Sequence, residues 1–436
     1  MRILLVTHRY PPLGVAGVER LSEQTALGLK AMGHEVTVLT RHDSDSPPFP
    51  KLHRTTRKGV GVTVISGGGP LLGRFPKLAP ALEQMFERTL VEADPDVVLV
   101  SHLLNHSPMY VAIARRWGVP VVMELHDFFV ACERAHLERF SGTLCQGPEG
   151  GRACATHCFP NDSRALERWA LRTHVFRHTL QLANAVICPS RFVADYFQDA
   201  FGPGLPPLHI IGNGVEACGD PLPSSSVSEG PLHLAYVGVV GPHKGPHVIL
   251  EALRLARLPA VRLSVFGQPI QPYFRHLAEA ASEMPNLDYR TFGAFEPVEL
   301  PLLLSDVDAL VVPSLVWETY SIAAHEALAC GVPVIASRVG ALPEVVRHGE
   351  NGLLVEPGSA YDLAINLQIL NDNREVGTTL RAGIRPNDWI SVEERMQRLE
   401  SALSGVLSTA ETATDVGLPL ELAVLRDSLL EAPIPG

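Results

Sequence analysis

Short apolar runs recur along the chain, and most are followed by a loop and a stretch with helical periodicity. Nearly continuous apolar runs of four to seven residues are typical of strands buried on both faces of a parallel sheet. The runs predict strands at Arg2–Thr7, Val36–Thr40, Val62–Ile65, Val97–Ser101, Val119–Leu125, Ala185–Pro189 and Leu208–Ile211, and then at Leu232–Val237, Val261–Phe266, Asp288–Phe292, Ala309–Val312 and Val334–Ser337. Strands that alternate with helices, such as those predicted at Val18–Met32 and Val248–Ala256, indicate an α/β fold with doubly wound sheets.

The strand pattern breaks once, at Glu216–Pro231, where the chain is rich in Pro, Ser and Gly. Such a stretch is typical of a linker. We therefore expect an N-terminal Rossmann-like domain over 1–215 and a C-terminal one over 232–385. A helix over 386–407 is expected to pack back on the N-terminal domain, and 408–436 form a tail.

Composition limits the function classes. The net charge of the 436 residues is −11, and no stripe of Lys and Arg is present, which argues against nucleic-acid binding. No window approaches the roughly 18 apolar residues of a transmembrane helix, and the first apolar run, Ile3–Val6, is too short for a signal peptide. We expect a cytoplasmic protein. The basic run Lys51–Lys58 is interpreted as a solvated loop.

The most informative segment is Val312–Ser337, VPSLVWETYSIAAHEALACGVPVIAS. It predicts a strand, a loop that carries Glu318, and a helix from about Tyr320 that carries Glu326. The first N–H groups of that helix, expected on Tyr320, Ser321 and Ile322, form a site suited to a diphosphate. The spacing places Glu326 roughly 8–9 Å further along the helix than its start. One carboxylate could face a sugar and the other a ribose.

This segment resembles the Glu–seven residues–Glu motif of the retaining glycosyltransferases of family 4. The stretches GVPVIAS, GALPE (Gly340–Glu344) and NGLLVEPG (Asn351–Gly358) match in the same order, and the resemblance covers nearly the whole chain. It implies the GT-B fold, in which two Rossmann-like doubly wound domains face each other across a cleft. It also implies a nucleotide-sugar donor, retention of the anomeric configuration, and catalysis that needs no cofactor or metal ion.

The resemblance implies roles for individual residues. Glu326 would bind the ribose hydroxyls, Glu318 the donor sugar, and Lys244 the diphosphate. His126, which precedes Asp127, would face the donor sugar from the first domain. The remaining implied donor contacts are Gly17, which lets a ligand approach the backbone, the loop from Gly293 to Phe295 beside the base, and the residues Thr319, Tyr320, Ser321 and Ile322 after the first Glu. The implied catalytic residues are His126, Lys244 and Glu318.

Three positions depart from the family pattern. Val239 stands where the family usually has an arginine that contacts the diphosphate, so Lys244 would act with Arg338, with Arg191 or with the helix dipole alone. Ala16-Gly17 replaces Gly-Gly, and Thr319-Tyr320-Ser321 replaces Gly-Phe-Gly. These departures bear on the identity of the donor sugar more than on the fold.

Four of the seven cysteines lie within one polar, Gly-rich stretch: Cys132, Cys145, Cys154 and Cys158. Four thiols from one loop can bind zinc tetrahedrally, so they form a candidate structural zinc site. The alternative is free thiols or a stray disulfide, since the spacings fit no standard zinc pattern closely. Cys188, Cys218 and Cys330 are interpreted as ordinary buried or linker cysteines.

Three other functions compete with glycosyl transfer. A nicotinamide dehydrogenase needs a Gly-x-Gly-x-x-Gly turn after the first strand, which this chain lacks. A GT-B sugar-nucleotide epimerase needs no acceptor, and a binding protein would not turn the donor over. We expect transfer from a UDP-sugar, or next a GDP-sugar, to a small-molecule acceptor. A lipid-linked or cell-surface glycan is the alternative acceptor, and the partners expected are the donor and the acceptor, with a homodimer left open.

Overall fold

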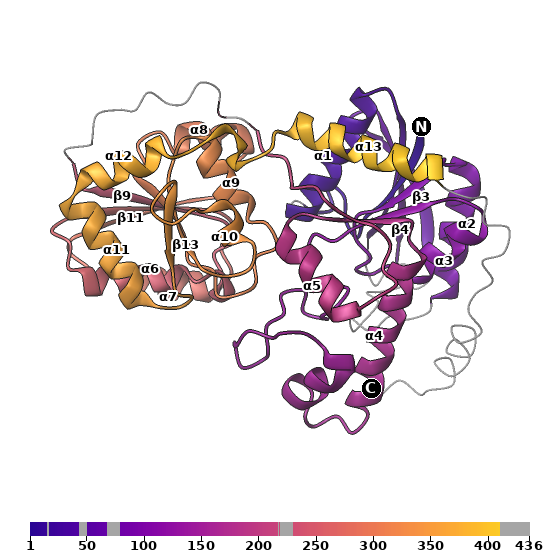
Figure 1. The fold of residues 1–436 in the computed structure, drawn as a ribbon, viewed down its shortest axis with the longest axis horizontal. Coiled ribbons are helices and arrows are strands. Elements are labelled where there is room, and N and C mark those ends of the chain that lie inside the picture. Colours follow the sequence, from indigo (N-terminus) through magenta and orange to yellow (C-terminus); the bar gives the residue numbers. More distant parts are fainter. Residues whose placement is uncertain (15–16, 43–49, 68–78, 217, 219–229, 410–436) are drawn as a thin grey trace. The chain divides into compact units, whose positions relative to one another are not determined.

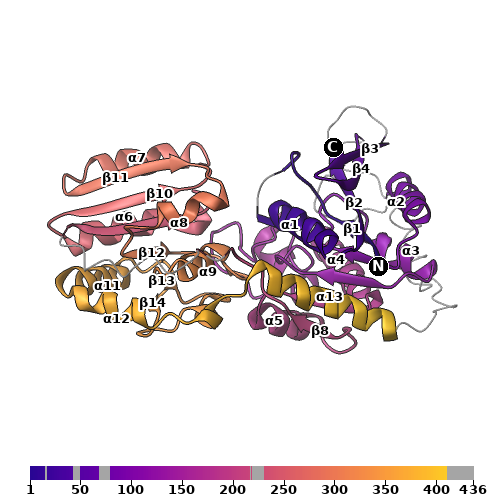
Figure 2. The same ribbon diagram turned by 90° about the horizontal axis from the view of Figure 1, so that it is seen from above.

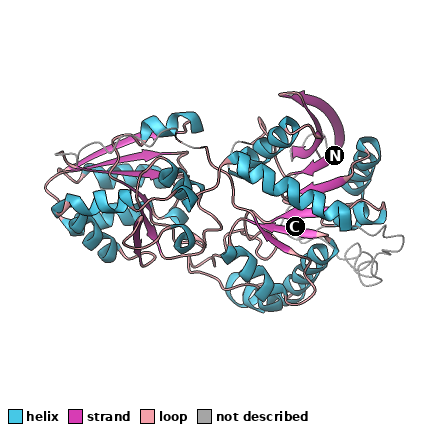
Figure 3. Cartoon of the chain, turned by 45° about the horizontal axis from the view of Figure 1, so that its top comes forward, coloured by secondary structure: helices cyan, strands magenta, loops and turns pink. Residues whose placement is uncertain are grey.

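A computed structural model of the chain describes residues 1–14, 17–42, 50–67, 79–216, 218 and 230–409. It divides into two compact units, Met1–Ile211 with Arg395–Gly436 (unit 1) and Gly212–Glu394 (unit 2). Ala16, the linker positions 217 and 219–229, and the tail beyond 409 lie outside the described residues. Figure 3 shows that each unit is a sheet with helices against it.

Unit 1 is built on an eight-stranded sheet with the order β3-β4-β2-β1-β5-β6-β7-β8. Its strands are parallel except β3, which runs antiparallel to β4. The bounds are β1 (Arg2–Val6), β2 (Glu35–His42), β3 (Lys51–Arg57), β4 (Val60–Ser66), β5 (Val97–Val100), β6 (Val121–Glu124), β7 (Ala185–Cys188) and β8 (Leu208–Ile210). All seven strands predicted in this half of the chain are present.

Strand β3 corrects the interpretation of Lys51–Lys58 as a solvated loop. Residues Lys51 to Arg57 pair with Ser66 to Val60 of β4 and form the edge of the sheet. The strand is almost entirely exposed, so it carries none of the apolar alternation by which strands are recognised. Charged side chains on an edge strand also discourage pairing with another chain, which explains a basic sequence at this position.

In the described residues of unit 1, six α-helices accompany the sheet, among them the C-terminal helix. They are α1 (Gly17–Ala31), α2 (Pro80–Ala93), α3 (Met109–Arg116), α4 (Ala165–Leu182), α5 (Arg191–Phe201) and α13 (Val392–Thr409). Helix α13 packs beside α1, as Figures 1 and 2 show, and Met396, Leu399 and Leu403 enter the same apolar core as β1 and β5. A Cβ on Gly28 of α1 would lie 2.6 Å from the Met396 side chain, so glycine allows this close approach.

Unit 2 contains a six-stranded, fully parallel sheet with the order β11-β10-β9-β12-β13-β14. Its strands are β9 (Leu232–Val237), β10 (Val261–Phe266), β11 (Leu287–Gly293), β12 (Ala309–Val312), β13 (Val334–Ser337) and β14 (Gly352–Val355). The sixth, β14, was not among the predicted strands. Counted within the unit, the order is 3-2-1-4-5-6, the order of a Rossmann fold.

Seven helices surround this second sheet. They are α6 (Pro246–Ala256), α7 (Tyr273–Ser282), α8 (Leu300–Leu303), α9 (Ile322–Ala329), α10 (Leu342–Val345), α11 (Ala360–Asp372) and α12 (Arg374–Ala382). The core of the unit joins α6 and α11 to strands β9 and β10 through buried Leu, Ile, Val and Ala side chains.

The boundary between the units lies four residues before the predicted one. Val215 belongs to unit 2, because its N–H donates to the Ile390 carbonyl over 3.0 Å and it pairs with Ser391. A Cβ on Gly214 would lie 2.6 Å from the Val392 Cα, so these two segments run backbone against backbone. The C-terminal helix likewise begins at Val392 and not at 386.

Candidate active site in two groups of residues

In unit 2 the sequence-predicted residues gather where the strand order reverses, between β9 and β12. Ligands of open α/β sheets bind at such a switch point, beside the carboxyl ends of the strands. Lys244 ends the short helix η3 (Pro242–Lys244) after β9, and Glu318 lies in the loop after β12. Lys244 Nζ lies 2.7 Å from Glu318 Oε1, and Ser314 Oγ donates to the same oxygen over 2.7 Å. The structure therefore joins two predicted catalytic residues in one ion pair.

Close packing holds the backbone around Glu318 in place. A Cβ on Gly340, whose φ is +60°, would lie 2.2 Å from the Glu318 carbonyl oxygen, and Ala341 N–H donates to that oxygen over 2.8 Å. A Cβ on Gly245, with φ +71°, would lie 2.0 Å from the Pro313 carbonyl oxygen. Only glycine fits both places without strain. The loops after β9, β12 and β13 are thus fixed together, and Glu318 is 7% exposed.

Helix α9 begins at Ile322, two residues later than predicted. Ser321 precedes it in a left-handed conformation with φ +65°, and its side chain does not cap the helix. The first N–H groups of a helix have no partner within it, so they remain available to an anion. Tyr320 lies before the helix and is 6% exposed, and its ring stacks on His325 with centroids 3.7 Å apart. Tyr320 is therefore part of the packing around the helix start.

Glu326 lies one turn inside α9 and is partly buried. Four residues separate it from Ile322, which corresponds to about 6 Å along the helix. This is shorter than the 8–9 Å expected when the helix was predicted to begin at Tyr320. Both glutamates of the motif still lie on the same strand–loop–helix segment, one before the helix and one a turn into it.

The other predicted donor-binding residues of unit 2 lie at the same edge of the sheet. Val239, which follows β9, is 40% exposed, and its carbonyl accepts a hydrogen bond of 2.7 Å from the Tyr236 hydroxyl. Gly293 ends β11 with φ +72°, and its carbonyl accepts from Gly267 N–H over 2.6 Å. Arg338, directly after β13, is exposed, with its Nε 3.7 Å from Glu356 Oε1. A weakly engaged cation is therefore present near the carboxyl ends of these strands.

In unit 1, His126 and Asp127 follow β6, as predicted. His126 Nε2 lies 3.0 Å from Ser101 Oγ and 3.4 Å from Glu124 Oε2. Asp127 Oδ2 lies 3.1 Å from His102 Nε2, and Phe129 N–H donates to its other oxygen over 2.8 Å. Burial alone would raise the pKa of Asp127, but the charge of His102 and these hydrogen bonds lower it to about 2.

Sequence reasoning missed several members of this group. His8 follows β1, its Nε2 lies 3.3 Å from Glu19 Oε1, and its ring centroid lies 4.6 Å from that of His102. Burial lowers the pKa of His8. Glu19 is 5% exposed on α1. The available signal was position, because His8 and His102 each come directly after a predicted strand. Gly17 opens α1, is exposed, and has open space where a Cβ would be.

The four cysteines of the candidate zinc site gather in unit 1 after β6. Cys154 and Cys158 are the two ends of the one-turn helix η2. Burial, and then the charges of Cys132, Cys158 and Cys145, raise the pKa of Cys154 to about 12. Across the part of the chain that the structure describes, no three His, Cys, Asp or Glu side chains are placed to hold a metal ion. The thiols are thus neighbours without a preformed metal site, and zinc binding stays a prediction.

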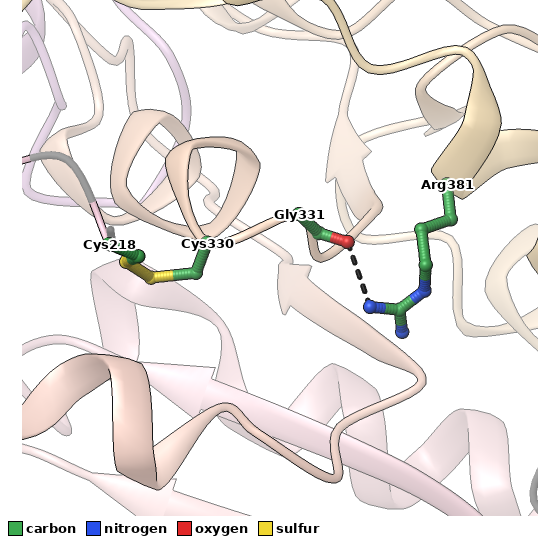
Figure 4. The surroundings of a disulfide bond; sticks show 4 residues. All are labelled: Cys218, Cys330, Gly331 and Arg381. Carbon is green, nitrogen blue, oxygen red and sulfur yellow. Dashed lines mark hydrogen bonds between the residues drawn. A yellow bond between two sulfur atoms is a disulfide. The ribbon is translucent and has the colours of Figure 1, made fainter. Parts of the chain in front are cut away.

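Two cysteines interpreted as ordinary thiols form a disulfide. Figure 4 shows Cys218 bonded to Cys330; their Cα atoms lie 4.9 Å apart, and the two residues are 112 positions apart in sequence. Cys330 follows directly on α9, the helix that carries Glu326. The next residue, Gly331, accepts a hydrogen bond of 2.9 Å from Arg381 Nη1. The C-terminal end of α9 is therefore tied both to the linker and to α12.

Comparison with known proteins agrees with this fold. Residues 15–217 match the family model described as Glycosyltransferase Family 4, and residues 223–385 match that of Glycosyl transferases group 1. A glycogen synthase of Mycobacterium tuberculosis is 29% identical over 391 residues, 86% of each chain. The sulfoquinovosyl transferase SQD2 of Arabidopsis thaliana is 24% identical over 89% of this chain and 71% of its own.

Solved structures share the architecture. Anabaena HepE in complex with UDP superposes with a TM-score of 0.67 at 19% identity, over 93% of this chain and all of HepE. Sucrose-phosphate synthase from Thermosynechococcus elongatus gives 0.62 at 19% identity, over 98% of both chains. The fold is therefore GT-B. With the two family matches, the chain is identified as a GT-B glycosyltransferase related to family 4.

Among the described helices, none is both long and apolar enough to cross a membrane.

Proposed function

We propose that this enzyme is a retaining glycosyltransferase that moves a sugar from a nucleoside-diphosphate sugar to a small-molecule acceptor. The observation that carries the proposal is the Lys244–Glu318 pair beside the uncapped start of α9. A cation and free helix N–H groups together suit a diphosphate. UDP is the first choice of nucleotide, and GDP the second. HepE, a structural neighbour, was solved with UDP, which supports that order.

In the proposed reaction, the bond between the anomeric carbon and the diphosphate oxygen breaks, and the diphosphate leaves with the electron pair. Lys244 and the N–H groups at the start of α9 stabilise the charge that develops there, a preorganised effect of the kind that often dominates catalysis. Glu318 hydrogen-bonds the donor sugar, Glu326 binds the ribose hydroxyls, and His126 contacts the sugar. The acceptor nucleophile attacks from the face that the diphosphate leaves and passes its proton to the departing diphosphate oxygen, so the configuration is retained. No step in this scheme requires a metal ion.

The pairing of Lys244 with Glu318 suggests how the site is kept ready. Without a ligand, each charge compensates the other, and both side chains are held in one geometry over 2.7 Å. An arriving diphosphate competes with Glu318 for Lys244 and frees the carboxylate for the sugar. Arg338 is the candidate second cation that takes the place of the arginine absent at Val239.

A ligand panel tests the proposal. Thermal unfolding is followed with UDP, GDP, dTDP, ADP and nicotinamide cofactors, because a ligand at a hundredfold excess over its dissociation constant stabilises by about 2.7 kcal/mol. The sugar nucleotide of the best ligand is then incubated with candidate acceptors, and NMR follows the anomeric proton of the product. An acceptor-dependent product of unchanged configuration is expected. Conversion of the donor without acceptor would indicate an epimerase, and inversion would refute retention.

A further inference from the structure

The disulfide between Cys218 and Cys330 lies at the far end of α9, the helix whose start forms part of the proposed diphosphate site (Figure 4). Cys330 follows α9 directly, and its N–H donates to the Glu326 carbonyl over 3.0 Å. The bonded cysteine and the second glutamate of the motif therefore share the last turn of the helix. A displacement of Cys330 acts on the same turn of backbone that carries Glu326.

The segment that precedes Cys218 also contacts the start of α9. A Cβ on Gly212 would lie 2.8 Å from Tyr320 Cε2, so this segment packs closely against the ring before the helix. Val215, further along, donates its N–H to the Ile390 carbonyl over 3.0 Å. Helix α9 has eight residues and is about 12 Å long, and the chain from Gly212 to Cys218 can span about 20 Å. The segment is thus long enough to follow the helix from its start to its end, where the disulfide attaches it covalently.

The position of Cys218 depends on the disulfide. Cys218 is half-buried, and it makes no hydrogen bond with the other residues that the structure describes. Its partner Cys330 is 0% exposed, so the bond is anchored in the interior of unit 2. A cross-link removes conformations that the chain would otherwise explore. Without it, the end of α9 has more freedom, and a ligand that must order this helix binds with a less favourable free energy.

Reduction of the bond follows ordinary thiol–disulfide exchange. The thiolate of an external thiol attacks the sulfur of Cys218, the less buried of the two residues, and the S–S bond breaks. Cys330 Sγ leaves with the electron pair and takes up a proton. A second external thiol then displaces Cys218 from the mixed disulfide, and Cys218 Sγ is protonated in turn. Two external thiols are thereby oxidised to a disulfide, and the protein disulfide is reduced to two thiols.

We propose that the Cys218–Cys330 disulfide is a redox switch for donor binding. In the oxidised form it holds α9 in the conformation that binds the nucleotide, and reduction by a small thiol or a dithiol protein weakens that binding. The sequence predicts a cytoplasmic protein, and the disulfides of that compartment are commonly transient and redox-sensing. The effect on donor binding rests on the proposed function, whereas the loosening of α9 on reduction does not.

Calorimetric titration of UDP into the full chain in its oxidised and reduced forms tests the proposal. Alkylation and mass spectrometry establish the state of the two cysteines in each sample. Cys218→Ser removes the bond, and Cys188→Ala, which replaces a buried thiol of β7 outside the disulfide, is the matched control. Hydrogen exchange of the α9 amides is recorded for each protein without ligand.

The oxidised form should bind UDP about fivefold or more tightly than the reduced form. Cys218→Ser should bind UDP as the reduced wild type does and show no response to the reductant, while Cys188→Ala should respond as the wild type does. Because the coupling between two equilibria is reciprocal, saturating UDP should shift the thiol–disulfide equilibrium toward the disulfide by the same factor. Reduction should also speed the exchange of amides at the end of α9.

Equal UDP affinity of the oxidised and reduced forms overturns the proposal. A response to the reductant that persists in Cys218→Ser also overturns it, because another thiol would then cause the response. Absence of UDP binding to every form refutes the proposed function, and hydrogen exchange then decides the redox control of α9 by itself. Faster exchange in α9 after reduction supports that control, and unchanged exchange overturns it.

Discussion

The ion pair between Arg395 of α13 and Glu124 of β6 ties the C-terminal helix into unit 1. Arg395 Nη2 lies 2.7 Å from Glu124 Oε1, and both residues are almost fully buried, at 1% and 4% exposed. Arg395 Nη1 also donates to Thr25 Oγ1 over 3.0 Å. We predict that Arg395→Met destabilises the protein strongly, because it leaves the Glu124 carboxylate buried without its cation.

Two estimates give the size of this effect. Removing one partner of a buried pair typically costs about 3–5 kcal/mol. Burial alone would raise the pKa of Glu124, but the charge of Arg395 first, and then that of His126 and the hydrogen bonds, lower it to about 2. A fall from the ordinary value of 4.5 corresponds to roughly 3 kcal/mol at neutral pH, of which Arg395 supplies the largest part.

The Glu124 pKa also determines how the stability of the protein depends on pH. Because the pKa of Glu124 is lower in the folded state, its stabilising contribution is complete above about pH 5 and is lost as the pH falls toward 2. Arg395→Met should therefore lower stability at pH 7 and flatten the loss between pH 5 and 2.

Urea unfolding at several pH values measures both effects, with hydrogen exchange of β6 amides to localise them in unit 1. Arg398→Met, an exposed cation on the same helix, is the matched control and should change stability by less than about 0.5 kcal/mol. Arg395→Met with Glu124→Gln should recover part of the loss, since no charge is then buried. If Arg395→Met matches the Arg398 control and keeps the same acid dependence, the reasoning is wrong.

Three further changes have defined outcomes. Gly340→Ala would press a Cβ against the Glu318 carbonyl oxygen, so kcat should fall at least tenfold with little change in nucleotide binding. Steady-state kinetics measure this effect, and an unchanged kcat contradicts the prediction. Cys218→Ser should lower the free energy of unfolding by about 2–5 kcal/mol under non-reducing conditions and have no effect after reduction. If the variant is as stable as the wild type under both conditions, the disulfide is refuted. Metal analysis of protein purified without chelator should find one zinc per chain if the four-cysteine group binds it, and its absence refutes the zinc prediction.

Most strands of the two sheets could be predicted from the sequence because buried parallel strands consist of nearly continuous apolar runs. Twelve of the fourteen strands in the described residues were predicted, and only β3 and β14 were missed. Strand β3 is exposed and basic, and β14, Gly352–Val355, lies inside the stretch NGLLVEPG, which was interpreted as a family motif and not as a strand. Local pattern carries no information on an exposed edge strand.

Residues of the site were likewise predictable from local sequence, whereas contacts between distant segments were not. Lys244, Glu318 and Glu326 were predicted because the local sequence around them resembles family 4 motifs, and Glu318 and Glu326 also lie in a strand–loop–helix segment suited to a diphosphate. The partners that hold the site were not, because each depends on residues far apart in sequence. Glu124 pairs with a residue 271 positions away, and Cys218 with one 112 positions away. Which buried acid meets which cation is decided by packing of the whole chain.

The central claim is that the start of α9 with Lys244 binds the donor diphosphate. Calorimetric titration of UDP into the wild type, Lys244→Met and Glu326→Gln tests it most directly, with Arg254→Met as the control, an exposed cation on α6. The account predicts measurable binding to the wild type and the control, and at least about tenfold weaker binding to each site variant. Equal UDP affinity in all four proteins would contradict it.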